Sequence, residues 1–334
     1  MIMDQAVRAE SIVWPLNGVA VMSASYAQED ERFDRIYSKS KQQQWNVDDY
    51  DWTYELDADN PLKLPDQTLL IYGSSLWDRL SDERRSEARR HFQSWTLSQI
   101  LHGEQGALMC AAKLAQGETS NSARMCAAVQ VFDEARHVEA YSRLVNDKMR
   151  LCYPLSSSLA SLLEDTVTSP DLDITNLGMQ ILVEGIALSI FHSLVVYSQD
   201  SFVKKLVTQI QRDEARHFAV GQITLTDLYT NELTSHELMI REEFLCEGIS
   251  VLYEHLCADD IWEPLGHNRK ECAGLVRESL IAATLRRNLF RRLVPAVKSM
   301  GLLRGRVVQV LESLRLLDYA DWPMRDIEQQ MSAP

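Results

Sequence analysis

The pentapeptide Asp-Glu-Ala-Arg-His occurs twice in this chain, at residues 133–137 and again at residues 213–217. In each copy a glutamate precedes a histidine by three positions, and on an α-helix that spacing places both side chains on one face, one turn apart. A carboxylate and an imidazole in this arrangement can bind the same metal ion. Two such helices, packed with two others that each supply one glutamate, form the ligand set of a di-iron or di-manganese helical bundle.

Helices separated by short turns are predicted from residue 80 onward. Apolar residues recur there at helical spacing, and Gly, Ser, Asn and Pro cluster between the helical segments. No alternation typical of strands appears after residue 75, so we expect an all-α domain. The predicted helices span residues 82–116, 122–150, 171–197, 201–230, 235–257, 269–299 and 303–317.

Two further glutamates occupy mirrored positions relative to the predicted turns. Glu104 and Glu134 are 30 positions apart and centred on position 119, whereas Glu184 and Glu214 are 30 positions apart and centred on position 199. Residues equidistant from a tight turn face each other in an antiparallel hairpin, so all four carboxylates lie about 22 Å from their turns, in one layer. We therefore predict a two-metal site formed by Glu104, Glu134, His137, Glu184, Glu214 and His217.

The residue types around these positions favour metal binding over a buried salt bridge. Glu184 lies within the apolar run Ile181–Leu188, where an ionised carboxylate needs a partner. A single Glu-x-x-His could be satisfied by an ion pair, but two copies with two mirrored glutamates indicate a metal site. Four carboxylates and two imidazoles suit Fe or Mn rather than structural Zn, and six ligands for two ions leave coordination positions open for chemistry.

The aspartate before each paired glutamate lies about 100° around its helix, away from the predicted metal ligands. We predict that Asp213 accepts a hydrogen bond from His137 and that Asp133 accepts one from His217, which would orient both imidazoles. The alternative is an ion pair within each helix, with the arginine three positions later. Both arrangements can hold at once.

The six-ligand pattern resembles the ferritin-like di-iron carboxylate superfamily, over about residues 45–225. The match is closest to its oxygen-activating branch: ribonucleotide reductase small subunits, their ligand-binding oxidase relatives, hydroxylase subunits of bacterial multicomponent monooxygenases, and di-iron N-oxygenases. The resemblance implies a ferritin-like four-helix bundle with additional C-terminal helices at residues 79–334, and we expect an irregular N-terminal arm at residues 1–78 to pack on it. It also implies one iron bound by Glu104, Glu134 and His137, a second bound by Glu184, Glu214 and His217, and bridging roles for Glu134 and Glu214.

Outside the ligands, the chain departs from two of these groups. Leu188 stands where the monooxygenase subunits carry a threonine, and Ile210 stands where the arylamine N-oxygenases carry an additional ligand histidine. His192 could replace that histidine, or it could be packed in the core; His102 is expected to be structural.

Two aromatic residues match positions of reductase small subunits. Tyr141, four residues after His137, occupies the place of a radical-forming tyrosine, and Trp45, before an acidic stretch, resembles a tryptophan that passes electrons through Asp213. A core tyrosine and a packed tryptophan are the alternatives. The tail at residues 325–334 contains no tyrosine, unlike the tail through which those reductases pass their radical.

We therefore expect an O2-activating di-iron oxygenase or oxidase of the monooxygenase type, with two Fe ions, or Fe and Mn, as cofactor. It would hydroxylate, N-oxygenate or desaturate a small organic substrate, and a separate ferredoxin or reductase would supply electrons. The alternatives are a radical-generating protein that uses Tyr141, and iron storage, although storage ferritins are about half this length. The substrate pocket is expected near Glu104, Leu108, Tyr141, Leu188 and His192.

Bulk properties suggest where such a protein would work. The net charge of −14 argues against nucleic acid as a partner, and we find no apolar run long enough to cross a membrane. The N-terminal segment MIMDQAVRAE lacks the pattern of a secretory signal, and the six cysteines are scattered, so we expect a cytoplasmic protein with reduced thiols. A homodimer is expected by analogy. Arginines 286, 287, 291 and 292 are expected on a solvated helix face, with docking of an acidic redox partner as the alternative.

Overall fold

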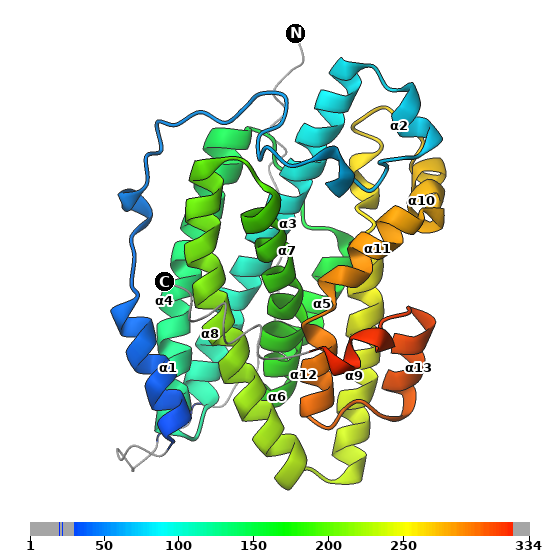
Figure 1. Ribbon diagram of the computed structural model, residues 1–334. Helices are drawn as coiled ribbons and strands as arrows, with labels where there is room; N and C mark the ends of the chain where they lie inside the picture. The colour runs from blue at the N-terminus through cyan, green and yellow to red at the C-terminus, as the bar shows by residue number, and fades with distance from the viewer. Residues whose placement is uncertain (1–19, 21, 23–29, 323–334) are drawn as a thin grey trace.

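The computed structural model describes residue 20, residue 22 and residues 30–322 of the chain. The predictions made for the N-terminal segment MIMDQAVRAE and for the tail at residues 325–334 lie outside the described residues. Within the described part the chain is helical and contains no strand. Its architecture is the predicted one, a ferritin-like four-helix bundle with additional C-terminal helices (Figure 1).

Two antiparallel hairpins form the bundle. The first joins two long helices, and the second joins a three-part helix to another long helix; these elements are α3 (Asp82–Gly117), α4 (Asn121–Arg143), α6 (Leu172–Asn176), η4 (Leu177–Val183), α7 (Glu184–Tyr197) and α8 (Ser201–Asn231). Ser120 caps α4 and Asp200 caps α8, each by accepting a hydrogen bond from a backbone N–H in the first helical turn. Both turns lie where the sequence predicts them, so the mirrored glutamates face one another.

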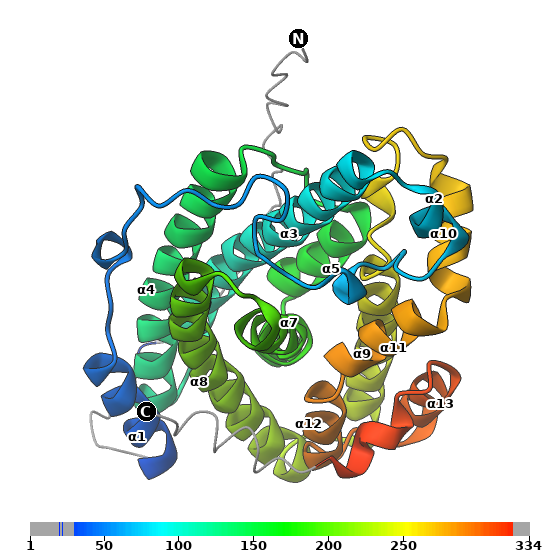
Figure 2. The same cartoon turned by 45° about the horizontal axis from the view of Figure 1, so that its top comes forward.

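The segment from α6 to α7 is the central helix of the bundle. It includes a stretch of mean hydropathy 1.8, and by length and composition it could cross a membrane, so the prediction that no such run exists is wrong. However, 61% of that stretch is buried inside the protein. Figure 2 shows α7 near the middle of the molecule, between α8 on one side and the C-terminal helices on the other. A helix enclosed by neighbours must be apolar on all sides, which explains this composition.

The central helix is not a regular α-helix, although the sequence predicts one continuous helix at residues 171–197. Its middle part, η4, has π-helical hydrogen bonding and ends directly before Glu184, the first residue of α7. A second π-helical stretch, η3 (Leu144–Met149), follows α4. Because π-helical turns are frequent at functional sites, the one beside Glu184 is the more informative of the two.

The N-terminal arm is more regular than the sequence predicts. It contains α1 (Glu31–Gln42), η1 (Val47–Asp49), η2 (Asp66–Thr68) and α2 (Ser75–Arg79). α1 lies along α4 and α8, and it packs Phe33, Ile36 and Tyr37 against them. The remaining residues of α1 are nearly all polar, so its apolar stripe is too narrow to stand out in the sequence.

The C-terminal part adds a second layer beside the central helix. It comprises α9 (Ser235–His255), η5 (Asp259–Ile261), α10 (Arg269–Glu278), α11 (Leu280–Leu289), α12 (Leu293–Ser299), α13 (Gly305–Ser313) and η6 (Leu317–Asp321), while α5 (Ser157–Thr168) lies between the two hairpins in sequence. The single helix predicted at residues 269–299 is wrong, because the chain turns twice there. Ser279 ends α10 and caps α11, and a turn at Phe290 precedes α12. These turns bring α11 against α7.

The close packing of α8 against η4 gives a test of the fold. A Cβ atom added to Gly221 would lie 2.7 Å from the Cβ of Gln180 and 2.8 Å from Asn176 Oδ1. We expect Gly221→Ala to lower the free energy of unfolding by about 1–3 kcal/mol, because the two helices must move apart. Chemical denaturation measures this. Gly274→Ala is the control, since nothing lies within 4 Å of that added Cβ and alanine favours the helix; equal effects of the two substitutions would contradict the packing described.

Candidate metal centre

The six predicted ligands meet in the interior of the four-helix bundle. Each of the four bundle helices contributes: α3 supplies one glutamate, α7 begins with one, and α4 and α8 each supply a glutamate and a histidine one turn apart. None of the six residues is more than 5% exposed. The structure therefore brings together Glu104, Glu134, His137, Glu184, Glu214 and His217.

Two overlapping groups of ligand atoms can be distinguished within this cluster. One contains Glu104, Glu134, His137 and Glu214, and the other contains Glu134, Glu184, Glu214 and His217; within each group one ligand atom per residue lies within 4.8 Å of all the others. Glu134 and Glu214 belong to both groups. Two ions bridged by two carboxylates would need such sharing, and these are the two glutamates to which the resemblance assigns bridging roles.

Both imidazoles direct the same ring nitrogen toward the carboxylates. Nδ1 of His137 lies 2.8 Å from Glu214 Oε1, 3.2 Å from Glu134 Oε2 and 3.3 Å from Glu104 Oε2. Nδ1 of His217 lies 3.0 Å from Glu134 Oε1. Each histidine thus presents Nδ1 to the place where a metal ion would be bound.

The opposite ring nitrogens contact the two predicted aspartates. Nε2 of His137 lies 3.1 Å from Asp213 Oδ2, and Nε2 of His217 lies 3.2 Å from Asp133 Oδ2. Burial would raise the pKa of Asp213, but its hydrogen bond and charge interaction with His137, helped by other partners, outweigh burial and lower that pKa to about 2. An ionised Asp213 accepts the Nε2–H of His137 and so directs Nδ1 to the place where a metal ion would replace the proton on that nitrogen.

The ion pairs within each helix are present as well. Arg136 pairs with Asp133, and Arg216 pairs with Asp213, in addition to the contacts of both aspartates with histidine. The two arrangements that the sequence left open therefore coexist, and both arginines are buried rather than turned outward.

The cluster fits a pair of metal ions because four ionised carboxylates need more positive charge than the two histidines can supply. Burial and the neighbouring Glu214 carboxylate raise the pKa of Glu104 and of Glu184 well above the ordinary value. Oε2 of Glu184 is buried and has no hydrogen-bond partner among the described residues. Divalent cations would neutralise the four carboxylates and satisfy this oxygen. Oxygen and imidazole donors in this proportion suit Fe or Mn.

Sequence reasoning missed a pair of glutamines that support the glutamates. Nε2 of Gln130 donates to Glu134 Oε1 at 3.0 Å and to Glu184 Oε1 at 2.9 Å, and Gln180 donates to Gln130 Oε1 at 2.6 Å. Gln130 lies one helical turn before Glu134, on the same face, and this spacing could have identified it.

Trp45 lies next to the metal centre and contacts Asp213, as its resemblance to the tryptophan of reductase small subunits implies. Its Nε1–H donates to Asp213 Oδ2 at 2.7 Å, and its ring stacks on His137 with a centroid distance of 6.3 Å. The Arg136 guanidinium lies 4.9 Å from the Trp45 ring centroid. Trp45, Asp213 and His137 thus form a continuous hydrogen-bonded series from the half-buried arm to a predicted ligand.

A cavity of about 260 Å³ reaches the centre from the side of α11, and three of the ligands, Glu104, Glu184 and Glu214, line it. Most other lining residues are apolar. Its position corrects the predicted pocket. Glu104 and His192 line the cavity, but Leu108, Tyr141 and Leu188 do not.

The three residues that were predicted in the pocket but do not line the cavity contact other parts of the protein. Leu188 is fully buried among residues of α8, α9 and the C-terminal helices, and Leu108 is half-buried on α3. Tyr141 is fully buried and stacks on Phe191 at a centroid distance of 6.1 Å. Helical spacing gives the face of a residue only approximately, so proximity in sequence to a ligand did not identify the cavity.

The two histidines considered as additional groups are not ligands in this arrangement. His192 belongs to neither ligand group; burial, helped by Arg291 and Arg292, lowers its pKa to about 4. Nε2 of His102 lies 2.9 Å from the carbonyl oxygen of Tyr153, which is the structural role expected.

Comparisons with known proteins give only distant matches. No family model matches the chain, and no curated protein matches it significantly. Two solved structures of a valine-to-isoleucine mutant of an R2-like ligand-binding oxidase are similar. The form with an anaerobically reconstituted Mn/Fe cofactor has 17% identity and a TM-score of 0.49, over 81% of this chain and 93% of that chain. The aerobically reconstituted form has 14% identity and a TM-score of 0.43, over 91% and 94%. The metal centre is inferred from this chain's own residues.

Metal content tests the ligand assignment. We expect the purified protein to bind about two Fe(II) or Mn(II) ions per chain, and Glu184→Gln or His217→Ala to lose at least one of them. Elemental analysis after gel filtration measures this. Glu139→Gln and His236→Ala, at exposed positions, are matched controls and should retain full metal content. Full metal binding by both ligand variants would refute the assignment.

The raised pKa values of Glu104 and Glu184 predict a pH dependence of metal binding. Burial and Glu214 disfavour the ionised forms of these carboxyl groups, so in the metal-free protein they keep their protons to a higher pH than an exposed glutamate does. A bound cation must displace those protons, so Mn(II) affinity should fall as the pH is lowered from about 8 to about 6. Calorimetry in buffers of different ionisation enthalpy counts the protons released. Release that is no smaller in Glu184→Gln would contradict this account.

Proposed function

We propose that this protein is a di-metal oxidoreductase of the monooxygenase type. In this proposal it activates O2 and hydroxylates, N-oxygenates or desaturates a small organic substrate. The observation that carries the proposal is that Glu104, Glu184 and Glu214 belong to the metal centre and also line an apolar cavity. A metal site with a purely structural role would have no need of such a cavity, whereas a catalytic site must admit its substrate.

The residues around the metal centre have distinct roles in the proposed reaction. When bound, two Fe ions, or Fe and Mn, would act as Lewis acids and would transfer electrons to O2 in the reaction that oxidises the substrate. Asp133 and Asp213 hold the histidines in orientation, and Gln130 holds Glu134 and Glu184. The apolar lining excludes bulk water from the part of the cavity beside the glutamates of the metal centre.

Electrons would come from a separate ferredoxin or reductase. The hydrogen-bonded series of Trp45, Asp213 and His137 supports this part of the proposal, because Trp45 is half-buried at the surface of the bundle. Exposed apolar side chains on neighbouring helices, Met109 of α3 and Met125 and Phe132 of α4, support assembly as a homodimer. A cytoplasmic location remains part of the proposal.

A radical-generating protein is the second candidate, and one observation favours it. Tyr141 is fully buried, and its hydroxyl group has no hydrogen-bond partner among the described residues. Burial and the nearby Glu104 carboxylate raise its pKa well above the ordinary value. The same tryptophan–aspartate–histidine series would serve electron transfer in this role. Iron storage is disfavoured, since an apolar cavity does not suit hydrated iron.

Oxygen uptake and EPR spectroscopy distinguish these candidates. We expect the protein loaded anaerobically with Fe(II) to consume O2 faster than free Fe(II) when reductant is present. Glu184→Gln should abolish the excess uptake, and Glu139→Gln should retain it. Full metal loading of the wild-type protein without excess uptake would refute the proposal.

For an oxygenase, Tyr141→Phe should retain at least about half of the O2 uptake, because Tyr141 does not line the cavity. The radical-generating alternative instead requires a stable tyrosyl EPR signal after exposure to O2, and that signal must be absent from Tyr141→Phe. Observation of such a signal would favour the second candidate.

A further inference from the structure

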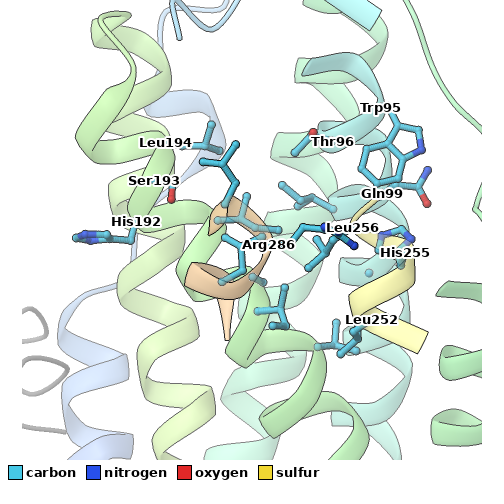
Figure 3. A pocket seen from close by; sticks show the side chains of 18 of the residues that line it. Trp95, Thr96, Gln99, His192, Ser193, Leu194, Leu252, His255, Leu256 and Arg286 are labelled. Atoms are coloured by element: carbon cyan, nitrogen blue, oxygen red, sulfur yellow. The ribbon is translucent and has the colours of Figure 1, made fainter. Parts of the chain in front are cut away.

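A buried arginine of α11 lines the cavity that reaches the metal centre. Arg286 of α11 is only 3% exposed and lines the cavity. Figure 3 shows its side chain within the pocket, near Leu252, His255 and Leu256. The prediction of a solvated helix face for arginines 286, 287, 291 and 292 is wrong for Arg286 and Arg292, which are both buried.

No carboxylate pairs with Arg286 in the described part of the chain. Its Nη1 lies 2.9 Å from Cys257 Sγ and 3.5 Å from the carbonyl oxygen of Tyr253, and the guanidinium lies 4.5 Å from the Tyr253 ring centroid. Its Nε is buried and has no hydrogen-bond partner among the described residues. Two nearby acids, Glu254 and Asp259, pair instead with Arg277.

The groups around Arg286 do not neutralise its charge. Burial raises the pKa of Cys257 to about 11, so this thiol stays uncharged near neutral pH. Burial also lowers the pKa of His255 to about 4, so that His255 is neutral near pH 7 and does not compensate the charge of Arg286. Arg291 also lines the cavity but is less buried. An enclosed guanidinium without an anion is costly, and its planar donors match a carboxylate.

The cavity lining combines acidic and basic groups on an apolar wall. Glu104, Glu184 and Glu214 of the metal centre line it, and so does Arg286 of α11. Apolar residues of α3, η4, α7 and the region after α9 line the same space, including Ile100, Val183, Ile186 and Leu256. Figure 2 shows α7 between α8 and α11, so the helix that carries Arg286 lies on the side of α7 opposite α8.

We propose that Arg286 anchors the carboxylate of an amphipathic substrate whose apolar body extends along the cavity toward the metal centre. The guanidinium binds the charged end, and the apolar lining binds the remainder. The substrate therefore presents a carbon remote from its carboxylate to Glu104, Glu184 and Glu214. That the ligand is a substrate rests on the proposed function, but the binding site itself is independent of turnover.

Calorimetric binding of simple carboxylates tests the anchor. The Mn(II)-loaded protein is titrated with octanoate and phenylbutyrate, and with octanol and phenylbutanol as uncharged matches. We expect at least one of these carboxylates to bind more tightly than its alcohol, and Arg286→Gln to weaken that carboxylate about 10-fold or more with little change for the alcohol. Arg286→Lys should lose part of this affinity, because it keeps the charge but not the planar pair of donors.

The control is Arg287→Gln, which makes the same charge change one residue away, outside the cavity lining. It should bind every probe as the wild-type protein does. Thermal unfolding and metal content of all variants establish that each is folded and loaded. If Arg286→Gln is misfolded, Arg286→Lys decides, and unchanged carboxylate affinity in it would overturn the proposal. Wild-type protein that binds neither carboxylate more tightly than its alcohol, or unchanged carboxylate affinity in folded Arg286→Gln, would also overturn it.

The same proteins separate this inference from the proposed function. Carboxylate binding that depends on Arg286, in a protein that shows no excess O2 uptake, would refute the oxidase and leave the anion site. Excess O2 uptake, together with carboxylate binding that does not depend on Arg286, would refute the anchor alone.

Discussion

The burial of four carboxylates in the middle of an apolar bundle is the constraint on which the rest of this structure depends. Glutamates that are at most 5% exposed cannot all be ionised without compensation. The chain supplies part of it through His137 and His217, which lie between the carboxylates and the outer aspartates. Metal cations would supply the rest. The centre therefore costs stability in the metal-free protein and gains it from metal binding, so that folding and metal loading are linked.

The backbone is shaped to hold those carboxylates in one layer. Equal hairpin lengths bring Glu104 opposite Glu134 and Glu184 opposite Glu214. The π-helical segment η4 ends directly before Glu184 and so sets the direction in which the Glu184 side chain projects from the central helix. Gly221 allows α8 to pack closely on Gln180 of η4, and Gln180 donates to Gln130. Packing away from the metal thus contributes to the placement of the glutamine that contacts Glu134 and Glu184.

The layer of ligands was predictable because it follows from spacing alone. Two Glu-x-x-His motifs and two turns define this layer without any tertiary detail, and the contacts of Asp133 and Asp213 follow from helix geometry. The helix α1 was not predictable, because Phe33 and its neighbours form a narrow apolar stripe in a polar segment. The breaks at Ser279 and Phe290 depend on local caps within a sequence that is otherwise helical. The cavity required the structure, since it depends on where α11 packs and not on distance along the chain from a ligand.

The position of α11 also separates two routes to the metal centre. Trp45 contacts Asp213 and does not line the cavity, whereas Arg286 does and belongs to α11, which lies on the side of α7 opposite α8 (Figure 2). An external electron donor that docks at Trp45 itself would therefore not obstruct the cavity. A substrate held at Arg286 would in turn leave the hydrogen-bonded series through Trp45 intact. In an oxidase that must receive electrons while its substrate is bound, separate routes to the metal centre allow both to be present together.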